Sequence, residues 1–108
     1  MTNPSHYIDG AWVAAKTTLP VVNPSDGQTI GQIGRGGADE IDAAVRAGHA
    51  ALDGEWGRLD AASRGRLLLR LADLIRRDVE KFAKLESEDV GKPLAQARAD
   101  ANVMARYF

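Results

Sequence analysis

Four glycines in residues 31–37 have the type and position to bind a phosphate group. They lie between a predicted strand and a predicted helix, where the glycines of a dinucleotide-binding turn let the backbone approach pyrophosphate. Counted from Gly34 and Gly36, that turn requires a third glycine at position 39, which holds Asp39 instead. Its carboxylate would stand at the helix N-terminus, where the phosphate should bind. We therefore interpret the segment as a plain strand-to-helix turn.

The remaining reactive side chains form no catalytic set. The chain has no cysteine, which excludes a thiol nucleophile, a cysteine-ligated zinc site and a disulfide scaffold within these residues. His6 and His49 lie far apart in the sequence, and neither shows the carboxylate spacing of a metal site or a catalytic triad. We interpret both histidines as packing or surface residues.

Three acidic residues, Glu86, Glu88 and Asp89, precede the Gly-Lys-Pro sequence at 91–93. Two neighbouring carboxylates can perform general acid–base catalysis, but no base, nucleophile or set of metal ligands accompanies them. A helix end is the plainer interpretation. A cation site stays open as an alternative, because one carboxylate together with backbone carbonyls can hold a hard cation.

A group of arginines in the middle of the chain resembles a basic stripe: Arg58, Arg64, Arg66, Arg70, Arg76 and Arg77. Acidic residues interleave with them at helical spacing, which favours a solvated helix face with ordinary ion pairs over a nucleic-acid surface. The formal net charge of −1 argues against nucleic-acid and membrane partners. We find no secretory signal and no apolar run of membrane-spanning length, so we expect a cytoplasmic protein.

The elements that must position these residues change type after residue 34. Residues 1–34 predict two hairpins, the first with strands at 7–8 and 11–13 around Asp9-Gly10, a favoured two-residue turn. The second has strands at 19–22 and 29–33, joined through the turn sequence Asn-Pro-Ser-Asp-Gly. Two hairpins alone are marginal in water and need a covering layer.

Residues 38–108 change to a helical period and predict three to four amphipathic helices. We expect the first helix to end at Gly54 in the left-handed conformation. Asp60 and Asp78 are the candidate N-caps of the second and third helices, and Gly91 should end the third. Pro93 suits the first turn of the fourth helix.

Apolar stripes predict the packed faces of these helices. The first helix carries Ile41, Ala44, Val45, Gly48 and Leu52; the second carries Leu67, Leu68, Leu71, Leu74 and Ile75; the last carries Leu94, Ala97, Ala101, Met104, Ala105 and Phe108. The last stripe still runs where the sequence stops, without a polar cap, and this ending favours a fragment.

Taken together, these segments resemble the N-terminal part of aldehyde dehydrogenases. The matching pieces follow in family order: Tyr-Ile-Asp-Gly-Ala-Trp-Val at 7–13, Val-Val-Asn-Pro-Ser-Asp-Gly at 21–27, Asp-Glu-Ile-Asp-Ala-Ala-Val at 39–45, Trp56, Ser-Arg-Gly-Arg-Leu-Leu at 63–68, Leu-Ala-Asp-Leu-Ile at 71–75 and Leu-Glu-Ser-Glu-Asp-Val-Gly-Lys-Pro-Leu at 85–94. The series covers nearly all of residues 1–108. It implies a mixed α and β fold that forms an incomplete outer layer of a dinucleotide-binding domain.

The resemblance implies a complete enzyme several times longer, which oxidises an aldehyde to a carboxylic acid with NAD or NADP. In this family a thiol attacks the aldehyde and hydride then passes to nicotinamide. A glutamate assists hydrolysis of the acyl-enzyme, while an asparagine and a backbone N–H stabilise the oxyanion. All of these groups lie downstream of residue 108, so we expect this segment to be structural and inactive by itself.

Few binding residues carry over from the resemblance. An intrasubunit K⁺ or Na⁺ in several family members corresponds to the carbonyls of Val21 and Val22 and to Asp89, with a third contact from downstream. Met104 corresponds to a helix that borders the substrate tunnel. The implied partners are the rest of the enzyme, further copies in a homo-oligomer and a small aldehyde. A stand-alone helical interaction module derived from the family is the alternative.

Overall fold

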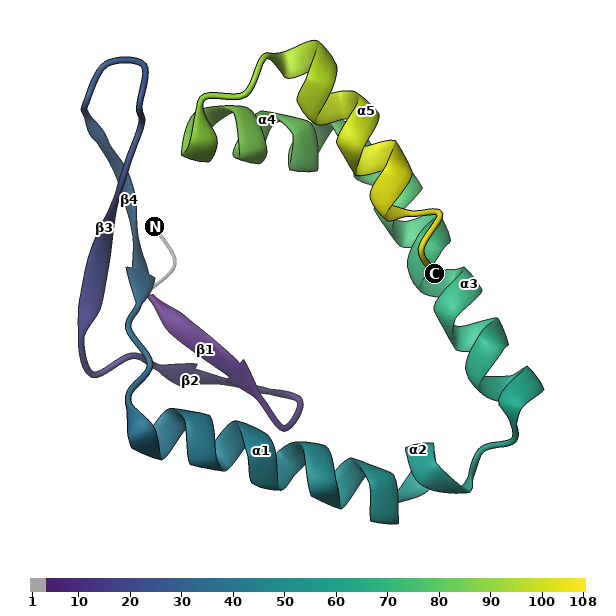
Figure 1. Cartoon of the computed structure of the whole chain (residues 1–108). Helices are drawn as coiled ribbons and strands as arrows, with labels where there is room; N and C mark the ends of the chain where they lie inside the picture. Colours follow the sequence, from purple (N-terminus) through teal and green to yellow (C-terminus); the bar gives the residue numbers. More distant parts are fainter. Residues whose placement is uncertain (1–3) are drawn as a thin grey trace. The chain divides into compact units, whose positions relative to one another are not determined.

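In the computed structural model, which describes residues 4–108, the chain forms four strands and five helices (Figure 1). In chain order they are β1 (Ser5–Ile8), β2 (Ala11–Ala14), β3 (Thr18–Val22), β4 (Thr29–Gly34), α1 (Ala38–Asp53), α2 (Glu55–Arg58), α3 (Ala61–Arg77), α4 (Val79–Val90) and α5 (Leu94–Met104). β1 pairs with β2 and β3 pairs with β4, each in a sheet of two strands. The mixed class, with two hairpins before the helices, is confirmed. The single turn α2 was not predicted.

The chain divides into two compact units. The first contains the described residues up to Val21 together with Thr29–Leu59, and it holds the first hairpin, α1 and α2. The second contains Val22–Gln28, which is the tip of the second hairpin, and Asp60–Phe108, which includes α3, α4 and α5. Across residues 4–108, none of the helices combines the length and the apolar character that crossing a bilayer requires.

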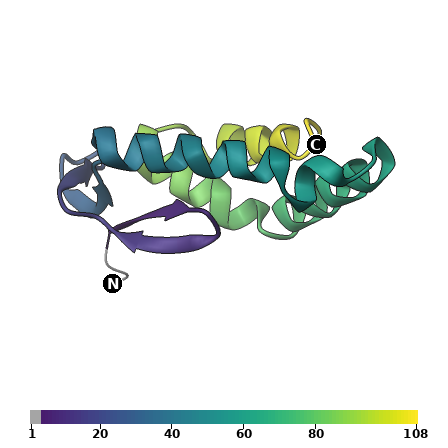
Figure 2. The same ribbon diagram turned by 90° about the horizontal axis from the view of Figure 1, so that it is seen from below.

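The first hairpin turns at the predicted pair of residues. Asp9 has a φ of 52° and Gly10 a φ of 75°, the two left-handed positions that a type I′ turn needs. The register places Tyr7 opposite Trp12, with their ring centroids 5.0 Å apart. Figure 2 shows the hairpin lying beside α1, and contacts with α1 come from β1.

The tip of the second hairpin is held by its own side chains. Asn23 Oδ1 accepts a hydrogen bond of 2.9 Å from the Ser25 amide, and Asp26 Oδ1 accepts one of 2.9 Å from the Gln28 amide. Gly27 has a φ of 72°, which glycine adopts without steric cost. Short polar side chains that bond to amides two residues ahead are the reason this sequence forms a turn.

The first helix forms as predicted, but it packs through a different face. Ala43 and Ala47 are half-buried, and α1 contacts β1. The predicted stripe is exposed instead, with Ile41 63%, Val45 53% and Leu52 63% exposed. The predicted stripe is therefore not the face through which α1 packs within the described chain. Alanine methyl groups let a helix approach a narrow hairpin closely, whereas large side chains on that face would hold the two apart.

Capping explains where the helices of the second unit begin and end. Asp60 accepts a hydrogen bond of 2.6 Å from the Ser63 amide, which confirms it as the N-cap of α3. Gly91 ends α4 with a φ of 72°, also as predicted. Asp78 separates α3 from α4, but its side chain bonds to Arg77 and makes no capping bond. Asp78 is therefore the N-cap of α4 by position, as predicted, but its carboxylate does not bond to the helix amides.

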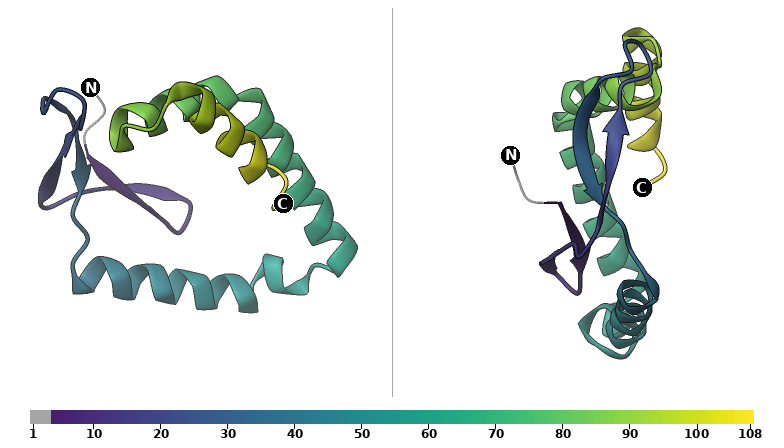
Figure 3. Two further views of the ribbon diagram at one scale, coloured as in Figure 1. Left: turned by 45° about the horizontal axis from the view of Figure 1, so that its top comes forward. Right: turned by 90° about the vertical axis from the view of Figure 1, so that its left-hand side faces the viewer.

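The second unit is built around small side chains. α5 packs against α4 and α3, as the left panel of Figure 3 shows. Its buried face repeats every four residues, as a helix face must. The buried side chains in residues 4–108 are Ala72 and Ile75 of α3, Ala83 of α4, and Ala97, Ala101 and Ala105 from the α5 region. Because most of these side chains are alanine, the backbones of α3, α4 and α5 can approach one another closely. Within residues 4–108, Ile75 is the one large side chain that is buried.

Three predicted helix boundaries require correction. Gly54 is extended, with a φ of −90° and a ψ of −153°, because α2 begins at the next residue and leaves no room for a left-handed cap. Pro93 is the N-cap of α5, with a φ of −53°, and does not lie in the first turn. The last helix ends at Met104, and the chain makes a turn at Ala105, so the apolar stripe does not continue in helical form to Phe108.

Candidate functional site

The glycine turn before α1 is filled by neighbouring protein atoms. A Cβ added at Gly34 would lie 2.8 Å from Ala15 Cβ and 2.9 Å from His6 Cε1, so close packing is sufficient to require glycine there. The Gly37 amide donates a hydrogen bond of 2.8 Å to Glu40 Oε2, and this bond holds the pKa of Glu40 below its usual value. A carboxylate of the helix itself therefore takes the amide that a phosphate would use.

Asp39, which the sequence placed at that helix N-terminus, bonds elsewhere. Lys16 Nζ donates to Asp39 Oδ2 at 3.3 Å, and the same ammonium lies 3.7 Å from Glu40 Oε1. The hydrogen bond to Asp39 is the main cause of the raised pKa of Lys16. The interpretation of residues 31–37 as a structural turn thus agrees with the geometry, with Glu40 as the residue that satisfies the amide.

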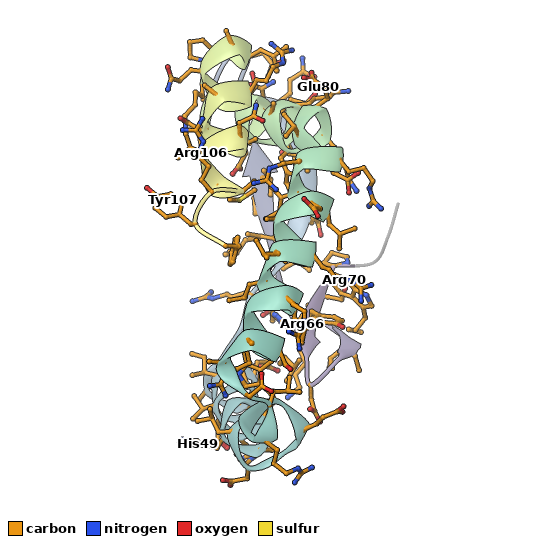
Figure 4. The ribbon with its side chains drawn as sticks, turned by 90° about the vertical axis from the view of Figure 1, so that its right-hand side faces the viewer. His49, Arg66, Arg70, Glu80, Arg106 and Tyr107 are labelled. Carbon is orange, nitrogen blue, oxygen red and sulfur yellow. The ribbon has the colours of Figure 1, made fainter. Side chains whose placement is uncertain are left out.

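The two histidines occupy contrasting positions. His6 Nε2 is buried and has no hydrogen-bond partner among residues 4–108; it lies against the backbone at Gly34. His49 is exposed on α1 (Figure 4). No three histidine, cysteine, aspartate or glutamate side chains in the described part of the chain gather closely enough to hold a metal ion. Neither histidine belongs to a reactive cluster.

The tip of the second hairpin meets the end of α4 inside the second unit. A Cβ added at Gly91 would lie 2.9 Å from Pro24 Cγ. Pro24 follows Val22 by two residues and Gly91 follows Asp89 by two residues, so this contact brings together the two segments that the cation prediction joins. Val21 belongs to the first unit, and its carbonyl stays a predicted ligand.

Asp89 is available for a ligand at the end of α4. Its side chain is exposed and forms no ion pair within residues 4–108. Lys92, the cation nearest to it in the sequence, donates instead to Glu86 and, at 2.6 Å, to Asp100. The carbonyl end of a helix also carries partial negative charge, which favours a cation.

Lys92 links α4 to α5 through these two bonds. The hydrogen bond to Asp100 is the main cause of the raised pKa of Lys92, and the bond to Glu86 adds to it. The pKa of Asp100 is lowered in turn, mainly by Lys92, with help from Gln96 Nε2 at 3.1 Å. The lysine of the Gly-Lys-Pro sequence therefore fixes the turn between two helices.

A second link between α4 and α5 is an ion pair between Arg98 of α5 and Glu80 of α4. Arg98 Nε and Nη2 donate to the two carboxylate oxygens of Glu80 at 2.5 and 2.9 Å, a bidentate pair that fixes the relative rotation of the helices. Glu80 is labelled in Figure 4. The same view shows Arg66 and Arg70 of the arginine stripe extending from α3. Ion pairs at i,i+3 and i,i+4 spacing were predicted for the arginine stripe, and within residues 4–108 the Asp73–Arg76 pair, at 2.9 Å, is the one that forms with such spacing.

The remaining predicted site residue, Met104, is the last residue of α5 and is half-buried. Tyr107, beyond it, extends away from the ribbon and is 82% exposed (Figure 4). Neither Lys92 nor Arg98 was predicted as a site residue. Their partners are six, eight and eighteen residues away, so helical spacing gave no signal for them.

Known proteins are similar to this chain in sequence and in the arrangement of its elements. The model of the Aldehyde dehydrogenase family matches residues 12–108. Betaine aldehyde dehydrogenase from Bacillus subtilis is 38% identical over 105 residues, which are 94% of this chain and 21% of that protein. Superposition on the crystal structure of a putative aldehyde dehydrogenase from Burkholderia cenocepacia gives a TM-score of 0.93 with 48% identity, over 95% of this chain and 22% of the other.

A further crystal structure, of an NAD-dependent aldehyde dehydrogenase from Sinorhizobium meliloti, gives a TM-score of 0.91 with 37% identity, over 97% of this chain and 22% of the other. The chain therefore spans about a fifth of the length of the relatives that it matches. Its likeness to them extends along almost the whole of its own length.

Proposed function

The chain belongs to the aldehyde dehydrogenase family, and from this premise we propose that it is the N-terminal segment of an enzyme that oxidises an aldehyde to a carboxylic acid with NAD or NADP. The observation that carries the proposal is the superposition of 95% of the chain on a family structure at 48% identity. NAD or NADP would accept the hydride in the complete enzyme.

The role of these residues in that enzyme is structural. The sequence holds no cysteine, so the thiol nucleophile of the family must come from outside it. The chain's own groups build a scaffold: Lys92 and Arg98 lock α4 to α5, and Glu40 satisfies the amide at the start of α1. We propose that this scaffold is part of the outer layer of the dinucleotide-binding domain.

We also propose that the carbonyls of Val21 and Val22 and the carboxylate of Asp89 hold a K⁺ or Na⁺ ion, with further ligands from the rest of the enzyme. Three features support the assignment. Pro24 touches the backbone at Gly91, Asp89 is exposed, and Lys92 is bonded to Glu86 and Asp100. Oxygen ligands of this kind suit a hard cation.

Three finer proposals follow from the family. Met104, at the end of α5, borders the tunnel through which the aldehyde enters. The complete enzyme is a homo-oligomer, which light scattering of the purified enzyme tests. It acts in the cytoplasm, which fractionation of the source cells tests.

A chimeric enzyme tests the principal proposal. In it, the segment of Bacillus subtilis betaine aldehyde dehydrogenase that matches this chain is replaced by residues 1–108. We expect the chimeric enzyme to reduce NAD or NADP when betaine aldehyde is added, and the 108-residue chain alone to give only the buffer rate.

Two results contradict the proposal. One is a folded chimeric enzyme without aldehyde-dependent reduction. The other is turnover by the 108-residue chain alone, with contaminating enzyme excluded by mass spectrometry. The mass of the intact protein isolated from its source distinguishes a long enzyme from a stand-alone helical module.

A further inference from the structure

One face of α1 carries an apolar stripe formed by Ile41, Val45, Gly48 and Leu52, called here the α1 stripe. The spacing of four, three and four residues places all four positions on the same face of the helix. The three large side chains are 63%, 53% and 63% exposed. Ala43 and Ala47, the half-buried alanines, lie on a different face. The large side chains are thus turned away from the face that packs within the first unit.

The residue in the middle of the stripe is a glycine. Glycine in a helix interior is less stable than alanine because it orders a more flexible backbone. A Cβ added at Gly48 would meet no heavy atom within 4 Å, so no described neighbour requires the glycine. The missing side chain lets another polypeptide approach the helix backbone between Val45 and Leu52.

We propose that the α1 stripe is the docking surface for the remaining part of the aldehyde dehydrogenase polypeptide. This inference rests on the proposed function. About four fifths of the length of each relative lies outside the part that this chain matches. In addition, 95% of the chain superposes with a TM-score of 0.93 on a structure that includes the rest. The chain therefore has the conformation found beside that remainder, while a contiguous exposed apolar face marks an interface.

The test compares two variants one residue apart, Gly48→Trp and His49→Trp, in the chimeric enzyme and in the 108-residue chain. His49 is exposed on the neighbouring face, so it provides a matched control. We expect neither substitution to lower the Tm of the isolated chain at low micromolar concentration, and the loss of a helix glycine in Gly48→Trp can raise it slightly. In the chimeric enzyme, Gly48→Trp should lower the Tm by roughly 5 °C or more because the indole overfills a packed interface. His49→Trp should leave it unchanged.

Equal Tm values for the two chimeric variants would overturn the inference, and continued oxidation of betaine aldehyde would show that the proposed function survives. A lower Tm for Gly48→Trp in the isolated chain would also overturn it, since the chain itself or a second copy would then cover the stripe. If Gly48→Trp yields no soluble chimeric enzyme, Val45→Ala decides, with His49→Ala as its control. A Tm loss confined to Val45→Ala supports docking, and equal values contradict it.

Discussion

The alanine contact between α4 and α5 gives the sharpest test of the second unit. Ala97 of α5 and Ala83 of α4 are both 0% exposed, so neighbouring atoms cover both methyl groups, and a larger side chain at either position must displace them. Ala95, two residues away on α5, is exposed. The substitutions Ala97→Leu and Ala95→Leu therefore add the same atoms to the same helix, once inside the contact and once outside it.

Overfilling a packed contact costs about 1–3 kcal/mol. For a chain of this size each kcal/mol shifts the Tm by about 4–8 °C, so Ala97→Leu should lower the Tm by roughly 5–20 °C. Ala95→Leu should change it little, because leucine is nearly as good a helix former as alanine. Circular dichroism at 222 nm, recorded on dilute 108-residue chain during heating, measures both. Equal Tm values for the two variants would refute close packing of α5 on α4.

Three further predictions concern the cation, the pH dependence and the exposed surface. In the chimeric enzyme, Asp89→Ala should lower the Tm in K⁺ or Na⁺ and much less in tetramethylammonium, because a bound ion stabilises the folded state by mass action. The control Asp53→Ala, at the end of α1, should show no such difference between salts. Equal Tm losses for Asp89→Ala in both kinds of salt would leave Asp89 without a cation role. The Lys92→Met substitution should lower the free energy of unfolding between pH 5 and 9, and this loss should shrink as the pH falls below 3.8, the ordinary pKa of Asp100. The reason is that a carboxyl whose pKa is lowered on folding loses its stabilising effect as it is protonated. A urea titration at each pH measures the loss, and a loss that persists at pH 2 would contradict the prediction. The isolated chain should self-associate at high micromolar concentration through its exposed apolar side chains, and light scattering that finds a monomer binding no hydrophobic dye would show a complete domain.

The parts of the fold that sequence predicted correctly depend on interactions within about four residues. Asp9-Gly10 specifies its turn through the φ values of two adjacent residues. Asp60 caps α3 by bonding to an amide three residues ahead. Gly91 ends α4 because its own φ is positive. Each of these outcomes needs no knowledge of distant residues, so a single sequence contains enough information.

The predictions that failed depend on neighbours in space or on the next element. Gly54 was expected to be left-handed, but the unforeseen turn of α2 begins directly after it and keeps it extended. Asp78 is the N-cap of α4 by position, but its carboxylate accepts hydrogen bonds from Arg77 and none from a helix amide. For the candidate site, Asp89 is a predicted cation ligand that rests on the family resemblance. The bonds of Lys92 to Asp100 and of Arg98 to Glu80 link residues far apart in the sequence. Periodicity within one helix cannot reveal them.

The exposure of the predicted apolar stripe of α1 has a wider physical meaning. The periodicity of apolar residues identifies an apolar face of a helix, but it does not show which element or polypeptide packs against that face. In residues 4–108 the contacts between elements rely mainly on alanine, at Ala43, Ala83 and Ala97 among others, while Ile41 and Leu67 remain exposed. Burying one large aliphatic side chain contributes about 1.5–3 kcal/mol, far more than a methyl group provides.

Most of the hydrophobic stabilisation that these helices can provide is therefore still unrealised in the described chain. Alanine contacts set the spacing of α3, α4 and α5, because a methyl group fixes how closely two backbones approach. The large side chains contribute fully only when another surface removes them from water. The chain, which spans about a fifth of the length of its relatives, thus holds the geometry of its own alanine contacts, while its exposed large side chains add stability only when another surface covers them.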